Sequence, residues 1–296
     1  MAIRPRLLKG LNLKKDHSRL SKKVVCLVLL AALPVLLTGQ AAASSLPDGA
    51  EEELLERYSA LDATRVGTGI TRFVYLHPSD RPMRADYLEA VQWSAETLRG
   101  WYGEQLGRFF PILPTPVVQV VALDNPASYY GTNDPGSSAY LWFWTNVLDE
   151  ALPKTGASFS DPENVWIFFA DAPAGCGQLS GGGTSGIAVM SHNDLRGLVG
   201  DPFLDCNGVV DPALTYPPAR WIGGQGHELG HAYGLPHPPG CDKGLPTCDY
   251  DALMWAGFYG GFPDETYLRE EEKSLVIAGP YVADQDFVNI FSDSFE

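Results

Sequence analysis

The chain has 296 residues, of which 36 are acidic and 21 basic, and its formal net charge at neutral pH is −15. A strongly acidic chain lacks the basic face that binding to phosphate groups requires, which argues against nucleic acid as a partner. The sequence contains no EF-hand loop and no glycine–aspartate repeat, so we interpret the acidity as an aid to solubility and not as calcium binding.

Residues 1–43 have the layout of a secretory signal peptide. Residues 1–23 hold eight Lys or Arg and one Asp, an apolar run covers residues 24–37, and three alanines at 41–43 provide a cleavage site. The apolar run is shorter than the roughly 20 residues of a membrane span. We expect this segment to be removed, which leaves a formal charge of −22, and the protein to be secreted to the periplasm or the medium without a stable membrane span. An uncleaved anchor is the alternative.

The remaining chain of about 250 residues fits one domain. We expect an acidic lead-in over residues 44–70, a catalytic domain over 71–280 and a C-terminal tail over 281–296. Turn residues and apolar periodicity predict the elements of the domain. In chain order they are a strand at 72–76, a helix at 88–102, a strand at 117–122, a helix at 141–152, strands at 165–169 and 187–190, and a helix at 219–233. This order predicts an α/β (α+β) fold, with helices packed on a mixed, twisted sheet.

The strongest motif begins at residue 227, where the sequence is His-Glu-Leu-Gly-His-Ala-Tyr-Gly-Leu-Pro-His. His227 and His231 are four residues apart, so both imidazoles project from one face of a helix. Gly234 can adopt the left-handed conformation that ends a helix. The chain can then turn back and bring His237 to the same zinc ion. Three histidines leave the fourth zinc position open, as in catalytic zinc sites.

This pattern resembles the metzincin clan of zinc peptidases. A second mark of the clan is a tight turn with a methionine beneath the zinc, and Met254 fits that role. The resemblance implies a metzincin-like fold with two main helices, Zn²⁺ as cofactor, and a peptide or protein as substrate. It also implies that a zinc-bound water hydrolyses the peptide bond, with Glu228 as the general base. We expect the enzyme to act as a monomer.

The sequence departs from several branches of the clan. Ala256 stands where astacin-like and serralysin-like enzymes have a tyrosine that can touch the zinc. No cysteine precedes Cys176 in the mature chain, so a cysteine-gated propeptide of the matrixin kind is absent. Pro238 is similar to serralysins, whose calcium-binding repeats this chain lacks. The branch therefore stays open.

We expect the strand at Ile187, Ala188 and Val189 to be the edge strand that pairs with an extended substrate, with ordinary sheet structure as the alternative. Four cysteines remain after signal cleavage, an even number that implies disulfides in an exported protein. Cys241 and Cys248 flank a short loop and are predicted to pair. This leaves Cys176 to pair with Cys206, which is the favoured choice among the three possible connectivities.

Three functions compete. The first is a secreted zinc endopeptidase. The second is a non-enzymatic adhesin or binding module on a peptidase fold, against which the intact Glu228 and the complete ligand set argue. The third is a zinc amidase for another substrate, such as peptidoglycan, and the acidic charge argues against a polyanionic wall polymer.

Overall fold

The computed structural model describes residues 69–159, 161–211 and 215–283. The predicted signal peptide lies outside the described residues, as do most of the predicted lead-in and tail. Within the described part, no helix is both long and apolar enough to cross a membrane.

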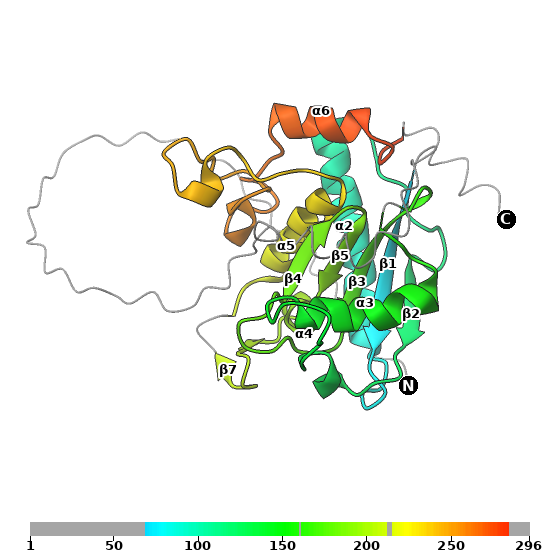
Figure 1. Cartoon of the computed structure of the whole chain (residues 1–296). Helices are drawn as coiled ribbons and strands as arrows, with labels where there is room; N and C mark the ends of the chain where they lie inside the picture. Colours follow the sequence, from blue (N-terminus) through cyan, green and yellow to red (C-terminus); the bar gives the residue numbers. More distant parts are fainter. Residues whose placement is uncertain (1–68, 160, 212–214, 284–296) are drawn as a thin grey trace, which may run out of the picture. The chain divides into compact units, whose positions relative to one another are not determined.

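A mixed sheet is the centre of this part of the chain, with the strand order β2-β1-β3-β5-β4 (Figure 1). Four strands are parallel, namely β1 (Ile70–His77), β2 (Val118–Ala122), β3 (Asn164–Ala170) and β5 (Ile187–Met190). The edge strand β4 (Gly181–Thr184) is antiparallel to β5. A separate ribbon pairs β6 (Phe203–Leu204) with β7 (Val210–Asp211). The predicted α/β (α+β) class with a mixed sheet is confirmed.

Side chains on both faces of the sheet are buried, because helices cover each face. Successive residues of a strand point to opposite faces. Phe73 and Tyr75 of β1 therefore join one hydrophobic core, and Val74 and Leu76 join the other. Every residue of β3 is buried, as a central strand between two helical layers requires.

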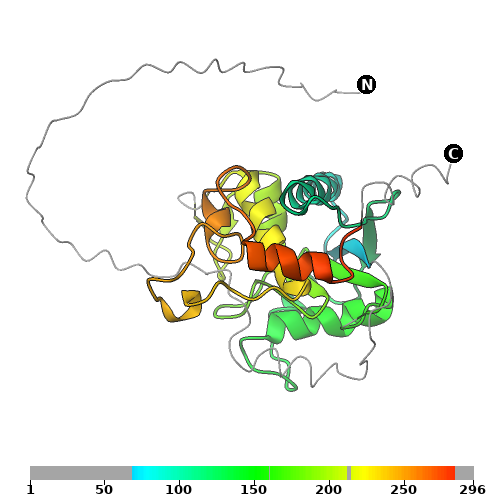
Figure 2. The ribbon, with the colours of Figure 1, turned by 90° about the horizontal axis from the view of Figure 1, so that it is seen from above.

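The two layers of helices lie on opposite sides of the sheet (Figures 1 and 2). Helices α2 (Ala85–Leu106) and α5 (Pro218–Ala232) contribute to the core on one side, and α3 (Trp142–Thr155) contributes to the core on the other. With 22 and 15 residues, α2 and α5 are the longest of the described helices. The shorter elements are α4 (His192–Leu198), α6 (Glu270–Ala278) and the 3₁₀ turns η1 (Ala127–Tyr129), η3 (Cys241–Lys243) and η4 (Gly257–Tyr259).

The segment Gly181–Thr184 is a strand that is not among the predicted elements. It forms a hairpin with β5 through the two-residue turn Ser185-Gly186, and both turn residues have positive φ, 45° and 90°. Positive φ at both positions is the feature of the hairpin turn whose twist matches that of the strands. Pairing with the adjacent strand β5 therefore makes a strand of a glycine-rich sequence.

Candidate metal centre

Helix α5 carries the histidine motif through the interior of the domain. Pro218 occupies its first turn, where the missing N–H has no helical partner to lose. Gly234, with φ 86°, follows its last turn. The helix is buried from Trp221 to Ala232, and a Cβ at Gly223, Gly226 or Gly230 would overlap neighbouring side chains. These glycines let the helix pack closely against its neighbours, and this close packing fixes the position of the motif.

His227 and His231 present the same nitrogen to one point. The Nδ1 atom of His227 donates to the carbonyl oxygen of Leu253 at 2.8 Å, and Nδ1 of His231 donates to that of Leu235 at 2.8 Å. Because a carbonyl oxygen only accepts, each Nδ1 carries the proton and each Nε2 is left with a lone pair. The two Nε2 atoms lie 3.0 Å apart.

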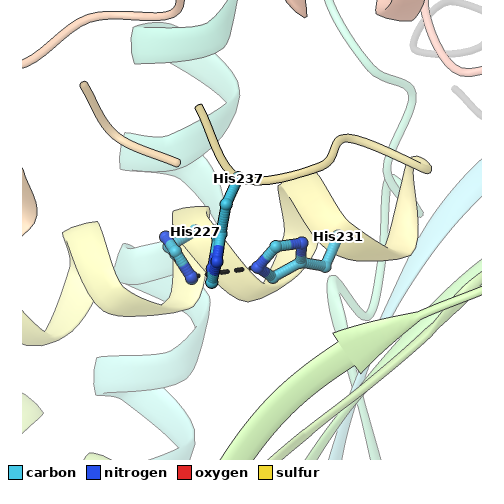
Figure 3. A group of neighbouring side chains, drawn as sticks. All are labelled: His227, His231 and His237. Carbon is cyan, nitrogen blue, oxygen red and sulfur yellow. Dashed lines mark hydrogen bonds between the residues drawn. The ribbon is translucent and has the colours of Figure 1, made fainter. Parts of the chain in front are cut away.

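His237 completes the group from the segment that follows the helix (Figure 3). Its Nδ1 atom lies 2.6 Å from Oδ1 of Asp242, and its ring is 4.9 Å from that of His231. One ligand atom from each of the three histidines lies within 4.8 Å of the others, and all three residues are buried. The structure thus brings together the three histidines that the sequence predicts as ligands.

These side chains fit a zinc ion. Burial, with the neighbouring histidines, holds the pKa of His227 well below its usual value and lowers that of His231 to about 3, so both rings are neutral. Two lone pairs that face each other at 3.0 Å repel unless a cation lies between them. In a tetrahedron with zinc–nitrogen bonds of about 2.0–2.1 Å, neighbouring nitrogens are about 3.3 Å apart. The donor set therefore matches zinc in chemistry and in spacing.

Glu228 follows the first ligand on the helix and is 2% exposed. Its Oε2 atom has no hydrogen-bond partner among the described residues. Burial raises the pKa of this carboxyl group well above its usual value, and the nearby Asp194 raises it further, whereas Arg220 and the backbone amide of Gly183 oppose the shift. A buried carboxyl group with a free oxygen beside three histidines can exchange a proton with a water molecule or a substrate.

Arg220 is the cation of this region, two turns before His227 on α5. Its guanidinium lies over four aromatic rings, at 4.3 Å from the ring centroid of Trp221 and 4.7 Å from that of Tyr259, with Phe258 and Tyr216 at 5.2 and 5.7 Å. The ring of Phe258 also contacts that of His227, at 5.2 Å. The aromatic rings hold the positive charge near the two buried carboxyl groups of Asp194 and Glu228.

Met254 is fully buried and lies against Gly230. In the sequence of the helix, Gly230 stands between His227 and His231. A Cβ at Gly230 would overlap the methionine sulfur. The preceding residue, Leu253, supplies the carbonyl that holds His227. The segment around Met254 therefore lies directly against helix α5, which carries His227 and His231.

The expectation that Ile187, Ala188 and Val189 form an exposed edge strand is wrong. These residues belong to β5, which pairs with β3 on one side and with β4 on the other. All three side chains are fully buried. The backbone groups of an internal strand are already paired, so they are not available to a substrate. The edge strand on this side of the sheet is β4.

The four cysteines of the described part form two disulfides. Cys241 is bonded to Cys248 and Cys176 to Cys206, which is the predicted pairing. The first bond closes the loop that contains Asp242, and the second joins the segment after β3 to the β6–β7 ribbon. Only the first of the two lies next to the histidines in the sequence.

Several residues near the histidines were not predicted from the sequence. Asp242 contacts His237, and the ring of Trp255 lies edge-on to that of His237 at 4.9 Å. The charges of Asp194 and Arg220 shift the pKa of Glu228 in opposite directions. A carboxylate five residues after the third histidine, inside a disulfide loop, was the available signal for Asp242. No local pattern indicated the others, because tertiary packing alone brings them to the site.

Comparisons with known proteins give structural likeness without sequence matches. No family model and no curated protein matches the sequence. OgpA from Akkermansia muciniphila has 21% identity over 75% of this chain and 63% of its own, with a TM-score of 0.48. Catalytically inactive OgpA with an O-glycopeptide substrate, glycodrosocin, has 20% identity over 75% and 64%, with the same score. Archaemetzincin from Methanopyrus kandleri has 17% identity over 73% and 98%, with a score of 0.39. The chain spans less than two thirds of the OgpA chains.

Proposed function

We propose that this protein is a zinc-dependent endopeptidase with His227, His231 and His237 as metal ligands and Glu228 as general base. The observation that carries the proposal is the pair of Nε2 atoms 3.0 Å apart, whose Nδ1 atoms both face carbonyl oxygens, with a third imidazole and a buried carboxyl group next to them. A histidine cluster with a structural role alone would not leave lone pairs facing each other and a buried carboxylate oxygen without a partner.

When bound, zinc supplies a Lewis acid that polarises the scissile carbonyl and makes water acidic. Glu228 then accepts a proton from water through its free Oε2 atom and returns it to the leaving amine. Arg220 and the amide of Gly183 stabilise the ionised form of Glu228, and burial favours the protonated form. Neither protonation state of Glu228 is favoured by all of its surroundings. This suits a group that takes up and releases a proton in each turnover.

The substrate lies along β4 in this proposal. The strand is at the edge of the sheet and pairs with another strand, β5, on one side only. Gly183 places β4 beside Glu228, since a Cβ there would overlap the backbone carbonyl of Glu228. An extended peptide that adds to this edge would pass next to the catalytic carboxyl group.

We further propose that residues 1–43 direct secretion and are removed after Ala43, that residues 71–280 form the catalytic unit, and that the enzyme works as a monomer. The two disulfides fit an oxidising compartment. Mass spectrometry of the exported protein tests the cleavage, because a chain that keeps residues 1–43 in the membrane fraction would be an anchored one.

Changing Glu228 to Gln tests the function. The variant keeps the volume of the side chain and leaves the three ligands in place, but an amide cannot act as a base. At matched zinc content we expect peptide turnover to fall by about 10²–10⁴-fold or more, with peptide binding retained. Glu265→Gln, at an exposed position, is the control and should cleave like the wild type.

The assay uses a peptide library with and without chelator, and includes O-glycosylated and unmodified versions of selected peptides. Cleavage inside the peptides, lost on chelation, supports an endopeptidase. A wild type that binds zinc and peptide but cleaves neither version would be a binding module. Hydrolysis confined to non-peptide amides would identify an amidase instead.

A further inference from the structure

The three histidines differ in what holds their Nδ1 atoms. His227 and His231 donate to backbone carbonyls of Leu253 and Leu235, which are buried core residues. His237 instead meets the side chain of Asp242, with 2.6 Å between Nδ1 and Oδ1. The side chain of Asp242 is 63% exposed, whereas that of His237 is 3% exposed. The one ligand outside the helix thus depends on an exposed carboxylate.

A short closed loop holds this carboxylate in place. Asp242 follows Cys241 directly, and the Cys241–Cys248 disulfide closes the loop over a separation of seven residues. Gly240 has a φ of 90°, and a Cβ there would overlap Thr247 on the opposite side of the loop. The amide of Leu245 donates to the carbonyl of Gly240 at 2.9 Å. A free surface aspartate would sample several rotamers and backbone positions, and this loop limits both.

We propose that Asp242 is a positioning residue for the zinc site, and that the Cys241–Cys248 disulfide acts on the metal through it. The carboxylate accepts the Nδ1 proton of His237, fixes the tautomer and the ring orientation, and makes Nε2 a better donor to a cation. The disulfide keeps the carboxylate within reach of the ring. This inference rests on the proposed zinc site, but it concerns residues that are not themselves ligands.

Zinc affinity measures the effect without relying on catalysis. The metal-free protein is titrated against a chromogenic chelator of known zinc affinity. We expect Asp242→Ala to weaken zinc binding by about 10–100-fold, as loss of a partner of a metal-bound histidine typically does. Asp242→Asn keeps an acceptor oxygen without the charge. Its zinc affinity should fall between that of the wild type and that of Asp242→Ala. Asp264→Asn removes a surface charge outside the loop and should bind zinc like the wild type.

A double-mutant cycle tests the role of the disulfide. Replacing Cys241 and Cys248 by serine should also weaken zinc binding, and adding Asp242→Ala to that variant should cost little more, because both changes remove the same support. The matched control replaces Cys176 and Cys206, and its zinc affinity should be unchanged. If the variant with serine at 241 and 248 folds poorly, the Cys241–Cys248 bond can instead be opened in the folded control variant by reduction, alkylation and desalting.

Three results would overturn the proposal. Asp242→Ala with wild-type zinc affinity removes the positioning role. Fully additive losses in the cycle mean that the disulfide acts independently of Asp242. Both results leave the proposed function intact. A wild-type chain that binds no zinc at all would overturn the proposed function and this inference together.

Discussion

Gly183 of the edge strand lies beside the backbone carbonyl of Glu228, with no space for a Cβ atom between them. We expect Gly183→Ala to push β4 and α5 apart and to lower the free energy of unfolding by about 1–3 kcal/mol, with loss of peptide cleavage. Gly100→Ala is the control, because it lies inside α2 with nothing within 4 Å of the added Cβ. The free energy of unfolding of the Gly100→Ala variant should rise by about 0.5–1 kcal/mol. Urea denaturation measures both, and an alanine at 183 without effect would contradict the close contact.

Zinc should stabilise the folded chain through its three histidines. A ligand that binds only the native state adds about 4 kcal/mol when its concentration is a thousand times its Kd. We therefore expect the Tm to rise on zinc addition and to fall on chelation. In His231→Ala this response should disappear, because one of three protein ligands is gone. His77→Ala, which lies outside the group, should keep the response. A zinc-dependent Tm in the His231 variant would exclude this ligand set.

Asp194 should make stability depend on pH. Burial raises its pKa from 3.8 to about 6, opposed by Arg220 and by its hydrogen bonds with Ser191. Because the native state holds this proton more tightly, the contribution of Asp194 is fully present below about pH 4 and is lost as the pH rises through about 6. Relative to Asp194→Asn, the wild type should gain about 1.5 kcal/mol of unfolding free energy between pH 8 and pH 5.

The comparison with Asp194→Asn matters because other groups titrate nearby. Glu228 also has a raised pKa, chiefly from burial, which the two proteins share, and Asp194 adds to that shift, so the difference reports Asp194 together with its coupling to Glu228. Denaturation curves at several pH values give that difference. A gap between wild type and variant that stays constant from pH 8 to pH 5 would mean that Asp194 does not titrate in this range.

A peptide bound along β4 should protect the amides of that strand. In Glu228→Gln, saturated with a peptide that the wild type cleaves, we expect slower hydrogen exchange over Gly181–Thr184 than in the free variant. Exchange over β2, at the other edge of the sheet, serves as the internal control. Protection at β2 and not at β4 would place the peptide elsewhere.

The histidine cluster could be predicted because the positions of its members follow from local spacing. His227 and His231 share a helix face by the helical repeat, and Gly234 marks where the helix ends. The central strands were predictable for a similar reason, since β3 is a continuous apolar run bounded by turns. In these cases a short stretch of sequence determines both the element and its burial.

The rest depends on pairing and packing that the residues of one segment do not specify by themselves. The glycines of β4 have no side-chain preference for a strand, and pairing with β5 alone makes them one. Helix α6 buries only two side chains, those of Glu272 and Val276. A helix with so little buried surface needs no apolar stripe, so periodicity does not indicate it. Helix α4 is an exception, because Ser191 and Asp194 form a capping box whose spacing is visible in the sequence.

The four-residue length of β4 also limits self-association of the protein through the edge of its sheet. An open sheet edge is a template on which a second copy of the chain can pair, and proteins commonly limit this by keeping edge strands short. A strand of four residues, three of them glycines, gives another copy few hydrogen bonds and almost no side-chain surface to grip. A peptide that is also held at the histidines does not depend on the strand alone. The same shortness can therefore leave room for a peptide that is also held elsewhere and still discourage self-association through the edge of the sheet.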